Sequence, residues 1–324
     1  MDTSPSGGAL RKATAVMQAL NFYLSEHPVI LSFRWSDDVW GSSWCFLIYS
    51  IALYVVVSIF LHLTLPLLLR RGQHVPLGPL PALHSLSMSV ISAITFAGLL
   101  LSATAEIRDT QWLWRRSKTP LEWLLCFPIG TRASGRVFFW SYVFYLSRYV
   151  HMLGTVLVVL RRRKLVFFQL FYHAISTFMS FLWLEFSQSF QVLAILFTTL
   201  AFFVIHGYRF WTAMTVRGAR LPLVLNCQIV LLGCNLVCHV GVLLLHFFTG
   251  GCNGIGAWTF NSVLNVAILM LFLNFYLRMY LRRRRKPKPN ENVGDCECRE
   301  NEIARSCSVF CAGKEADSNK LKSS

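Results

Sequence analysis

The sequence predicts an all-α, polytopic membrane protein with seven transmembrane helices around a polar-lined interior. Of its 324 residues, 55% are hydrophobic and only 14% are charged, and the mean hydropathy is +0.50, unlike an average soluble domain. Seven apolar segments approach or exceed the ~20 residues that a helix needs to cross a bilayer. Basic clusters lie at the ends of these segments. Together these features predict one membrane domain.

The predicted spans follow one another within that domain, which we place at residues 41–283. Their expected bounds are 44–69, 88–105, 137–160, 165–186, 190–211, 221–248 and 257–281. Residues 1–40 form a polar segment in which apolar positions from Ala13 to Leu24 predict a short interfacial helix. Because the first 28 residues lack a continuous apolar core, the first span is expected to act as its own anchor. Residues 284–324 are expected to be a disordered, basic, cysteine-containing cytosolic tail.

The placement of the basic residues that give the net charge of +16 predicts the orientation. With the amino terminus outside and seven spans, the basic clusters at 70–71, 161–164, 209–220 and 282–288 all fall on the cytosolic side, as the positive-inside rule requires. The loop before the third span is an exception, because its basic residues at 108, 115, 116, 118, 132 and 136 would be luminal. Its aromatic part, 112–128, is expected to be re-entrant or interfacial. The ending Lys320-Leu-Lys-Ser-Ser324 is similar to a Lys-x-Lys-x-x retrieval signal, which predicts the endoplasmic reticulum membrane with a cytosolic carboxyl terminus.

Polar side chains recur at helical spacing inside the spans, so those of one span share a face. We call each such set of side chains a stripe. The stripes are Tyr145, Arg148, His151 and Thr155; Gln169, Tyr172, His173 and Ser176; Thr199, His206 and Arg209; Gln228, Asn235, His239 and His246; and Asn261, Asn265 and Asn274. Hydrogen bonds between helices, worth ~1 kcal/mol or less, would account for any single residue. Stripes on four successive helices instead predict a shared polar cavity, because polar groups in hydrocarbon are costly.

The ten cysteines do not predict a disulfide framework. Cys126 and four others lie in or next to spans, where thiols behave mostly as small apolar side chains. Cys252 lies in a predicted luminal loop and is open to oxidation. The spacings of the tail cysteines do not fit the usual C-x2-C pairs of zinc sites, so we predict no metal, and S-acylation is the preferred alternative.

Several function classes are excluded by what the sequence lacks. There is no set of H-x3-H and H-x-x-H-H boxes for a membrane di-iron oxygenase, no Gly-rich phosphate loop, no G-x-S-x-G elbow and no paired carboxylates. No cofactor is therefore predicted. A transporter would need broken helices or intramembrane carboxylates, which are scarce here. The basic residues flank spans, so nucleic acid is not an expected partner.

Short runs spread over residues 21–281 carry a family resemblance. They are Leu24-Ser-Glu-His-Pro28, Phe33-Arg-Trp35, Gly41-Ser-Ser-Trp44, residues 141–148, Phe181-Leu-Trp-Leu-Glu185, Cys227-Gln-Ile-Val230, residues 251–258 and Phe260-Asn-Ser-Val-Leu-Asn265. Together they resemble the plant branch of the ELO-type fatty acid elongases. The resemblance implies seven helices around a tunnel, residence in the endoplasmic reticulum, and condensation of long-chain acyl-CoA with malonyl-CoA to 3-oxoacyl-CoA. Membrane lipid and other elongation-cycle enzymes are implied partners, and a homodimer is left open.

The functional motifs of that family are only partly kept. Its H-x-x-H-H box falls on Gln169-Leu-Phe-Tyr-His173, which retains the last His. Its K-x-x-E-x-x-D-T box falls on residues 148–155, which retain a cation at Arg148 and the Thr at Thr155. Its H-x-x-M-Y-x-Y-Y box falls on residues 202–209, which retain Tyr208, and its T-x-x-Q-x-x-Q box retains Gln228.

The resemblance therefore implies a site built around His173. Condensation needs an imidazole that takes the acyl group and a partner that polarises the thioester carbonyl or moves a proton. The candidate partners are Tyr172, Gln169, His151 and His206. Arg148, Thr155, Tyr208, Arg209 and Gln228 are the candidate substrate-binding residues. The alternative is a non-catalytic ELO-like subunit that binds acyl chains or regulates an elongase complex, which the incomplete motifs favour.

Overall fold

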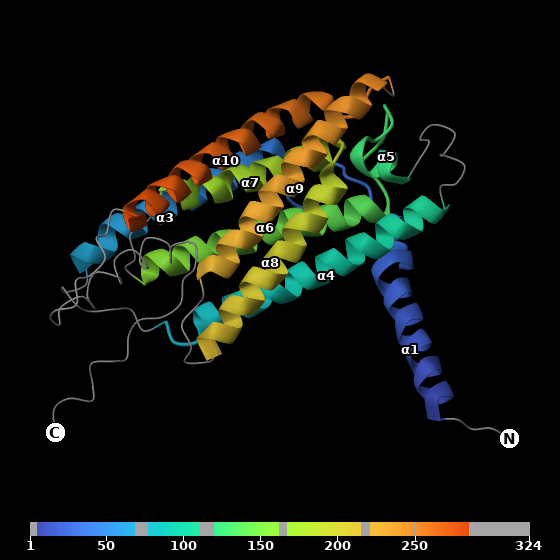
Figure 1. Cartoon of the computed structure of the whole chain (residues 1–324), viewed down its shortest axis with the longest axis horizontal. Coiled ribbons are helices and arrows are strands. Elements are labelled where there is room, and N and C mark those ends of the chain that lie inside the picture. Colours follow the sequence, from blue (N-terminus) through green and yellow to red (C-terminus); the bar gives the residue numbers. More distant parts are fainter. Residues whose placement is uncertain are drawn as a thin grey trace.

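The computed structural model of the chain is a bundle of long helices, with a short amino-terminal helix leaning away from it (Figure 1). It describes residues 5–68, 77–109, 120–161, 167–214, 221–248 and 250–284. Within these residues every regular element is helical, apart from one isolated bridge between Arg34 and Ser134. The 284–324 tail, apart from Arg284, and most of the basic clusters lie outside the described residues, as does Trp112 of the loop predicted to be re-entrant.

Each of the seven predicted spans coincides with a helix. These are α3 (Trp44–Leu68), α4 (Leu80–Asp109), α6 (Arg136–Leu160), α7 (Phe167–Glu185), α8 (Gln191–Met214), α9 (Leu221–Phe248) and α10 (Ile255–Arg284). Shorter elements are α1 (Pro5–Asn21), the π-helical turn η1 (Phe22–Glu26), α2 (Pro28–Leu31) and α5 (Pro120–Leu125). The helix predicted near Ala13 is thus present as α1. Four of the long helices, α3, α4, α6 and α8, have described segments long and apolar enough to cross a membrane.

Helix α4 is longer than the sequence predicted, running from Leu80 to Asp109 rather than over 88–105. Its first turns carry Pro81, His84 and Ser85, which lower the local hydropathy but line an internal cavity. A helix that faces a polar interior needs no continuous apolar run, so counting apolar residues gave too short a segment.

The core of the bundle forms where α4 and α6 approach closely. Gly98 of α4 leaves room for the indole of Trp140 on α6, because a Cβ at position 98 would overlap that ring. The indole N–H of Trp140 donates to the carbonyl of Leu24 at 2.8 Å, which ties η1 to the bundle. Large side chains such as Tyr145, Phe181 and Ile195 are fully buried around this contact.

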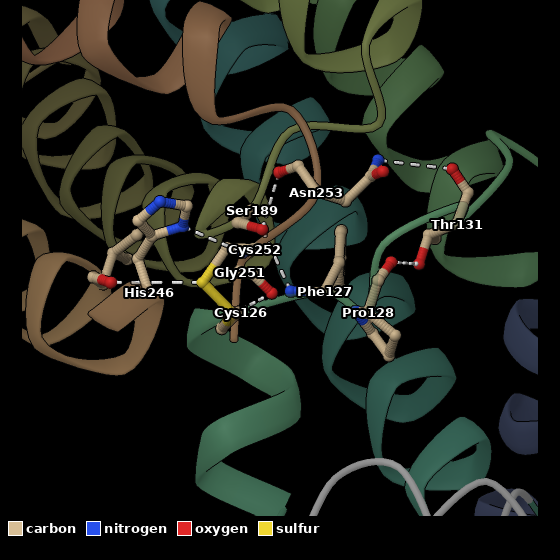
Figure 2. The surroundings of a disulfide bond; sticks show 10 residues. Cys126, Phe127, Pro128, Thr131, Ser189, His246, Gly251, Cys252 and Asn253 are labelled. Carbon is tan, nitrogen blue, oxygen red and sulfur yellow. Dashed lines mark hydrogen bonds between the residues drawn. A yellow bond between two sulfur atoms is a disulfide. The ribbon is translucent and has the colours of Figure 1, made fainter. Parts of the chain in front are cut away.

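Three loops meet at one end of the bundle and form what we call the cap, residues 126–135, 186–190 and 250–254 (Figure 2). A disulfide joins Cys126 to Cys252, which are 126 residues apart in sequence. The expectation of a free apolar thiol at Cys126 was wrong, because folding brings it next to the cysteine already predicted to be open to oxidation. His246 also belongs here, since its Nδ1 accepts from the Cys252 amide at 3.0 Å.

Asn253 connects all three parts of the cap. Its side-chain oxygen accepts from the Gly130 amide at 3.1 Å, and its side-chain nitrogen lies within 3.3 Å of the carbonyl oxygens of Thr131, Phe186 and Ser187. The Ser189 hydroxyl donates to the Asn253 carbonyl at 2.8 Å and accepts from the Phe127 amide at 3.0 Å (Figure 2). The side chains of Asn253 and Ser189 therefore add to the backbone bonds between the loops, which run from the Ser189 amide to the Asn253 carbonyl and from the Asn253 amide to the Phe127 carbonyl.

The segment before α3 lies on the same cap. The Trp35 amide donates to the Ala133 carbonyl at 2.9 Å, and the Trp35 indole N–H donates to the Glu185 carboxylate at 2.9 Å. Nearby, Arg136 pairs with Glu106 at 3.3 Å and with Asp109 at 2.8 Å. Arg136, one of the basic residues that disagreed with the predicted charge distribution, is thus paired with carboxylates at the end of α4.

Candidate active site

A cavity of about 90 Å³ opens between α4, α6, α7 and α8, and we call it the outer cavity. Its lining is mostly polar on the side of α7 and α8. The titratable and amide side chains that line it are His84, His151, Arg161, Gln169, Tyr172, His173, His206 and Arg209. Six of these were predicted site residues, and they come from three separate helices.

Three imidazoles meet on the wall of the outer cavity. The ring centre of His151 on α6 lies 4.5 Å from that of His173 on α7 and 5.3 Å from that of His206 on α8. Their side chains are 7%, 8% and 2% exposed for His173, His151 and His206, so none is a surface residue. The structure thus brings together an imidazole cluster that no contiguous motif in this chain contains.

Buried polar atoms of this cluster are left available to a ligand. The Nδ1 atoms of His151, His173 and His206 and the side-chain oxygen of Gln169 are buried and have no hydrogen-bond partner among the described residues. Buried polar groups are nearly always paired in native proteins, so several unpaired atoms on one wall indicate a binding or reactive site. The described residues contain no arrangement of three His, Cys, Asp or Glu side chains suited to a metal ion.

His84 is a further cavity residue that the sequence reasoning missed. Its ring lies 6.4 Å from that of His206, and its Nε2 is 3.1 Å from the carbonyl oxygen of Val150. Gly154 leaves space for it, because a Cβ there would come within 3.0 Å of the His84 ring. The spacing of Pro81, His84 and Ser85 was the available signal, since residues three and four apart share a helix face.

A second cavity of about 80 Å³, the inner cavity, lies between α6, α7, α8, α9 and α10. Tyr172 lines both cavities. The other polar residues that line the inner cavity are Arg148, Ser176, Gln188, Thr198, Asn235, His239, Asn261 and Asn265. The stripes predicted on the third to seventh spans thus converge on two adjoining polar spaces rather than one.

Arg148 lies beside the inner cavity with its side chain only 2% exposed. Its guanidinium is 4.0 Å from the ring centre of Phe144 and 4.9 Å from that of Phe202, and it donates to Ser147 Oγ at 2.9 Å. Among the described residues no carboxylate lies within ion-pair distance of it. Aromatic faces and hydroxyls stabilise the cation only in part, which leaves it able to bind an anionic or hydrogen-bonding group.

The remaining predicted site residues lie elsewhere. Thr155 is fully buried and lines neither cavity; its hydroxyl is 2.9 Å from the Tyr54 hydroxyl and 3.4 Å from the side-chain nitrogen of Gln169. Thr155 therefore contacts Gln169, which lines the outer cavity, without lining that cavity itself. Tyr208 is half-buried on α8 and lines neither cavity. Gln228 belongs to α9, but its side chain lies outside the described residues.

Comparison with known proteins identifies the family. The model of the ELO (GNS1/SUR4) family matches residues 39–288. The chain is 61% identical over 277 residues to "Fatty acid elongase 3-like" of Arabidopsis thaliana, covering 84% of this chain and 96% of that protein. It is 24% identical over 279 residues to "Fatty acid elongase A" of Dictyostelium discoideum, covering 82% and 95%. No solved structure matches.

The family match covers all seven long helices, and the alignment with the plant relative covers nearly the full length of that relative. Both agree with the resemblance carried by the short runs from Leu24 to Asn265. The protein is therefore a member of the ELO (GNS1/SUR4) family.

Proposed function

We propose that this protein elongates fatty acids by condensing a long-chain acyl-CoA with malonyl-CoA to give 3-oxoacyl-CoA, free CoA and carbon dioxide. The observation that carries the proposal is the cluster of His151, His173 and His206 around the outer cavity. Relatives named fatty acid elongases supply the reaction class. The cluster supplies groups that can perform it.

In the first step, an imidazole nitrogen of His173 attacks the thioester carbonyl of the acyl-CoA. A bond forms between this nitrogen and the acyl carbon, and the carbon–sulfur bond breaks so that CoA leaves as a thiol after protonation. His151, 4.5 Å away between ring centres, is placed to move the proton. Gln169 and Tyr172 line the same cavity and are candidate donors to the oxyanion that forms.

In the second step, malonyl-CoA loses carbon dioxide, and the enolate carbon that remains attacks the acyl carbon on His173. The nitrogen–carbon bond breaks, and the electron pair returns to the ring. Arg209 lines the outer cavity and would neutralise the malonyl carboxylate or a CoA phosphate. Each proposed step uses groups of the chain itself and of the two substrates.

The positions of the imidazoles explain how activity is compatible with an incomplete box. His151 stands where the family's K-x-x-E-x-x-D-T box has its Glu, and His206 stands where the H-x-x-M-Y-x-Y-Y box has its first Tyr. His151 faces His173, and His206 faces His151 on the same cavity wall. The imidazoles lost from α7 at Gln169 and Tyr172 are thus compensated in space from α6 and α8.

A non-catalytic subunit is the second candidate, and one contact favours it. Phe202 occupies the position of the first His of its box, and its ring lies 4.9 Å from that of His151 and 5.9 Å from that of His206. An apolar ring there reduces the polar surface that a reacting thioester would meet. Such a protein would keep the acyl-binding cavity and act through other elongation enzymes.

We further propose residence in the endoplasmic reticulum with a cytosolic carboxyl terminus. The Cys126–Cys252 disulfide supports this orientation, because disulfides persist in oxidising compartments such as the lumen. Helix α9 ends and helix α10 begins at the cap, so α10 leaves it toward the opposite side. The basic residues after α10 then face the cytosol.

The decisive experiment is conversion of labelled malonyl-CoA by the purified protein in detergent or lipid. With a long-chain acyl-CoA present, we expect a 3-oxoacyl product two carbons longer, and none from a His173→Ala variant of equal stability. New long chains in cells that lack their own elongases would exclude the subunit. An unchanged profile at good expression, with other elongation enzymes co-purifying, would exclude the enzyme.

A further inference from the structure

The inner cavity combines apolar walls with a group of polar side chains. Its apolar lining includes Phe144, Met179 and Trp183, and its polar lining includes Arg148, His239, Gln188, Asn235, Asn261 and Asn265. A purely apolar chain end placed here would remove water from these groups without replacing its hydrogen bonds, which is costly. The lining therefore indicates a ligand that forms hydrogen bonds.

The unpaired atoms in this cavity are acceptors. The Oδ1 atoms of Asn235 and Asn261 are buried and have no hydrogen-bond partner among the described residues, and the Asn261 side chain is only 1% exposed. The side-chain nitrogens of Asn261 and Asn265 each have a partner. The Asn261 Nδ2 donates to the side-chain oxygen of Gln188, and the Asn265 Nδ2 lies 3.2 Å from His239 Nε2. A ligand must therefore donate at least one hydrogen bond here.

Arg148 favours a ligand group that accepts hydrogen bonds. A guanidinium only donates, and this one has no carboxylate partner among the described residues. A hydroxyl can donate one hydrogen bond, to one of the two asparagine oxygens, and accept another from Arg148. A carboxylate only accepts and would leave both asparagine oxygens unpaired, and a methyl group would form no hydrogen bond with any of these groups.

The inner cavity adjoins the outer one, because Tyr172 lines both. An acyl group held at His173 would need to pass Tyr172 to enter the inner cavity. At about 80 Å³ this space has room for the end of a chain or for a few waters. We propose that the inner cavity binds the hydroxyl of an acyl chain hydroxylated at its ω end, so that this protein prefers ω-hydroxyacyl substrates over unsubstituted ones. The inference rests on the proposed function for the position of the acyl group.

The first test is binding, which does not depend on turnover. Displacement of a fluorescent acyl chain from the purified protein in detergent is measured with acyl-CoAs of increasing length, each with a methyl, hydroxyl or carboxyl end. At one chain length we expect the hydroxyl-ended form to bind about tenfold more tightly than the methyl-ended form, since two or more hydrogen bonds are gained. The preference is expected at one length because the hydroxyl must reach the inner cavity.

Two variants test whether the inner cavity causes the preference for the hydroxyl-ended chain. Asn235→Leu keeps the side-chain volume and removes an acceptor that has no partner among the described residues, so the hydroxyl preference should fall at least threefold. Asn274→Leu, at an exposed position on the same bundle that lines neither cavity, should keep it. Equal or tighter binding of the methyl-ended form at every length would overturn the inference, as would a hydroxyl preference that survives Asn235→Leu. Tighter binding of the carboxyl-ended form would overturn it in favour of an anion site.

Turnover of the same substrates separates this inference from the proposed function. Product from methyl-ended chains without a hydroxyl preference in binding would retain the elongase and reject the ω-hydroxyl site. A hydroxyl preference in binding without product from any chain would retain the site and reject the enzyme. Failure of every acyl-CoA to displace the probe would reject both.

Discussion

At the residue scale, the outer cavity brings three imidazoles together without a shared motif. His151, His173 and His206 come from α6, α7 and α8, and each leaves its Nδ1 buried and unpaired within the described residues. A buried atom without a partner costs free energy, on the order of 1–3 kcal/mol, so its retention at three neighbouring positions is best explained by a ligand. The neighbouring Gln169 and Tyr172 extend the same polar wall.

The first prediction concerns the second imidazole. His151→Ala should lower the rate of condensation by about 10²-fold or more, because general acid–base groups typically contribute that much. The rate is measured with purified protein at saturating acyl-CoA. His62→Ala on α3, which lines neither cavity, is the control and should keep the wild-type rate. Normal turnover of His151→Ala would remove this residue from the reaction.

At the element scale, the approach of α4 to α6 depends on a residue without a side chain. Gly98→Ala should destabilise the protein by about 1–3 kcal/mol, because the new Cβ overlaps the Trp140 indole and a well-packed core yields little. Gly233→Ala on α9 is the matched control, since a Cβ there meets nothing within 4 Å. Thermal unfolding in detergent should show a lower Tm for the first variant and an equal or higher Tm for the second. Equal Tm values would mean that Trp140 moves aside easily.

The arrangement of the helices also depends on the loops of the cap. Asn253→Ala should lower the Tm, because it removes side-chain bonds to Gly130, Thr131, Phe186 and Ser187 at once, at a cost of about 1–3 kcal/mol. Replacing both Cys126 and Cys252 by Ser should also lower it. Since both changes act on the same loops, their effects should not add. Additive losses in a double-mutant cycle would show that the two cross-links act independently.

At the scale of the whole molecule, the cap and the charge distribution predict one orientation. Helix α10 starts at the cap and ends at Arg284, next to a strongly basic run. A glycosylation reporter inserted after Lys288 should remain unglycosylated, whereas one inserted in the 249–254 loop should be glycosylated. A glycosylated reporter after Lys288 would contradict both the seven crossings and the luminal position of the disulfide. Arg108 pairs with Asp109, and Arg136 pairs with Glu106 and Asp109.

The sequence by itself determined the fold class, the positions of the seven long helices and the family. Apolar runs and helical spacing are local properties, so they can be read without knowing which helices are neighbours. The sequence also predicted ten site residues, of which six line the outer cavity and Arg148 lines the inner one. The bounds predicted for α4 were wrong, because polar residues on its interior face interrupt the apolar run in the sequence.

Only the tertiary structure decided which stripes face each other. Residues such as His84 and His206 are far apart in sequence, and nothing in the spacing of either one indicates that their rings lie 6.4 Å apart. The division into two cavities and the Cys126–Cys252 disulfide likewise depend on how α4 to α10 pack. Periodicity places a polar residue on a face of its own helix, but the partner of that face is set by the packing of side chains between helices. Chemistry that needs two helices, as the His151–His173 pair does, therefore becomes visible only in the folded chain.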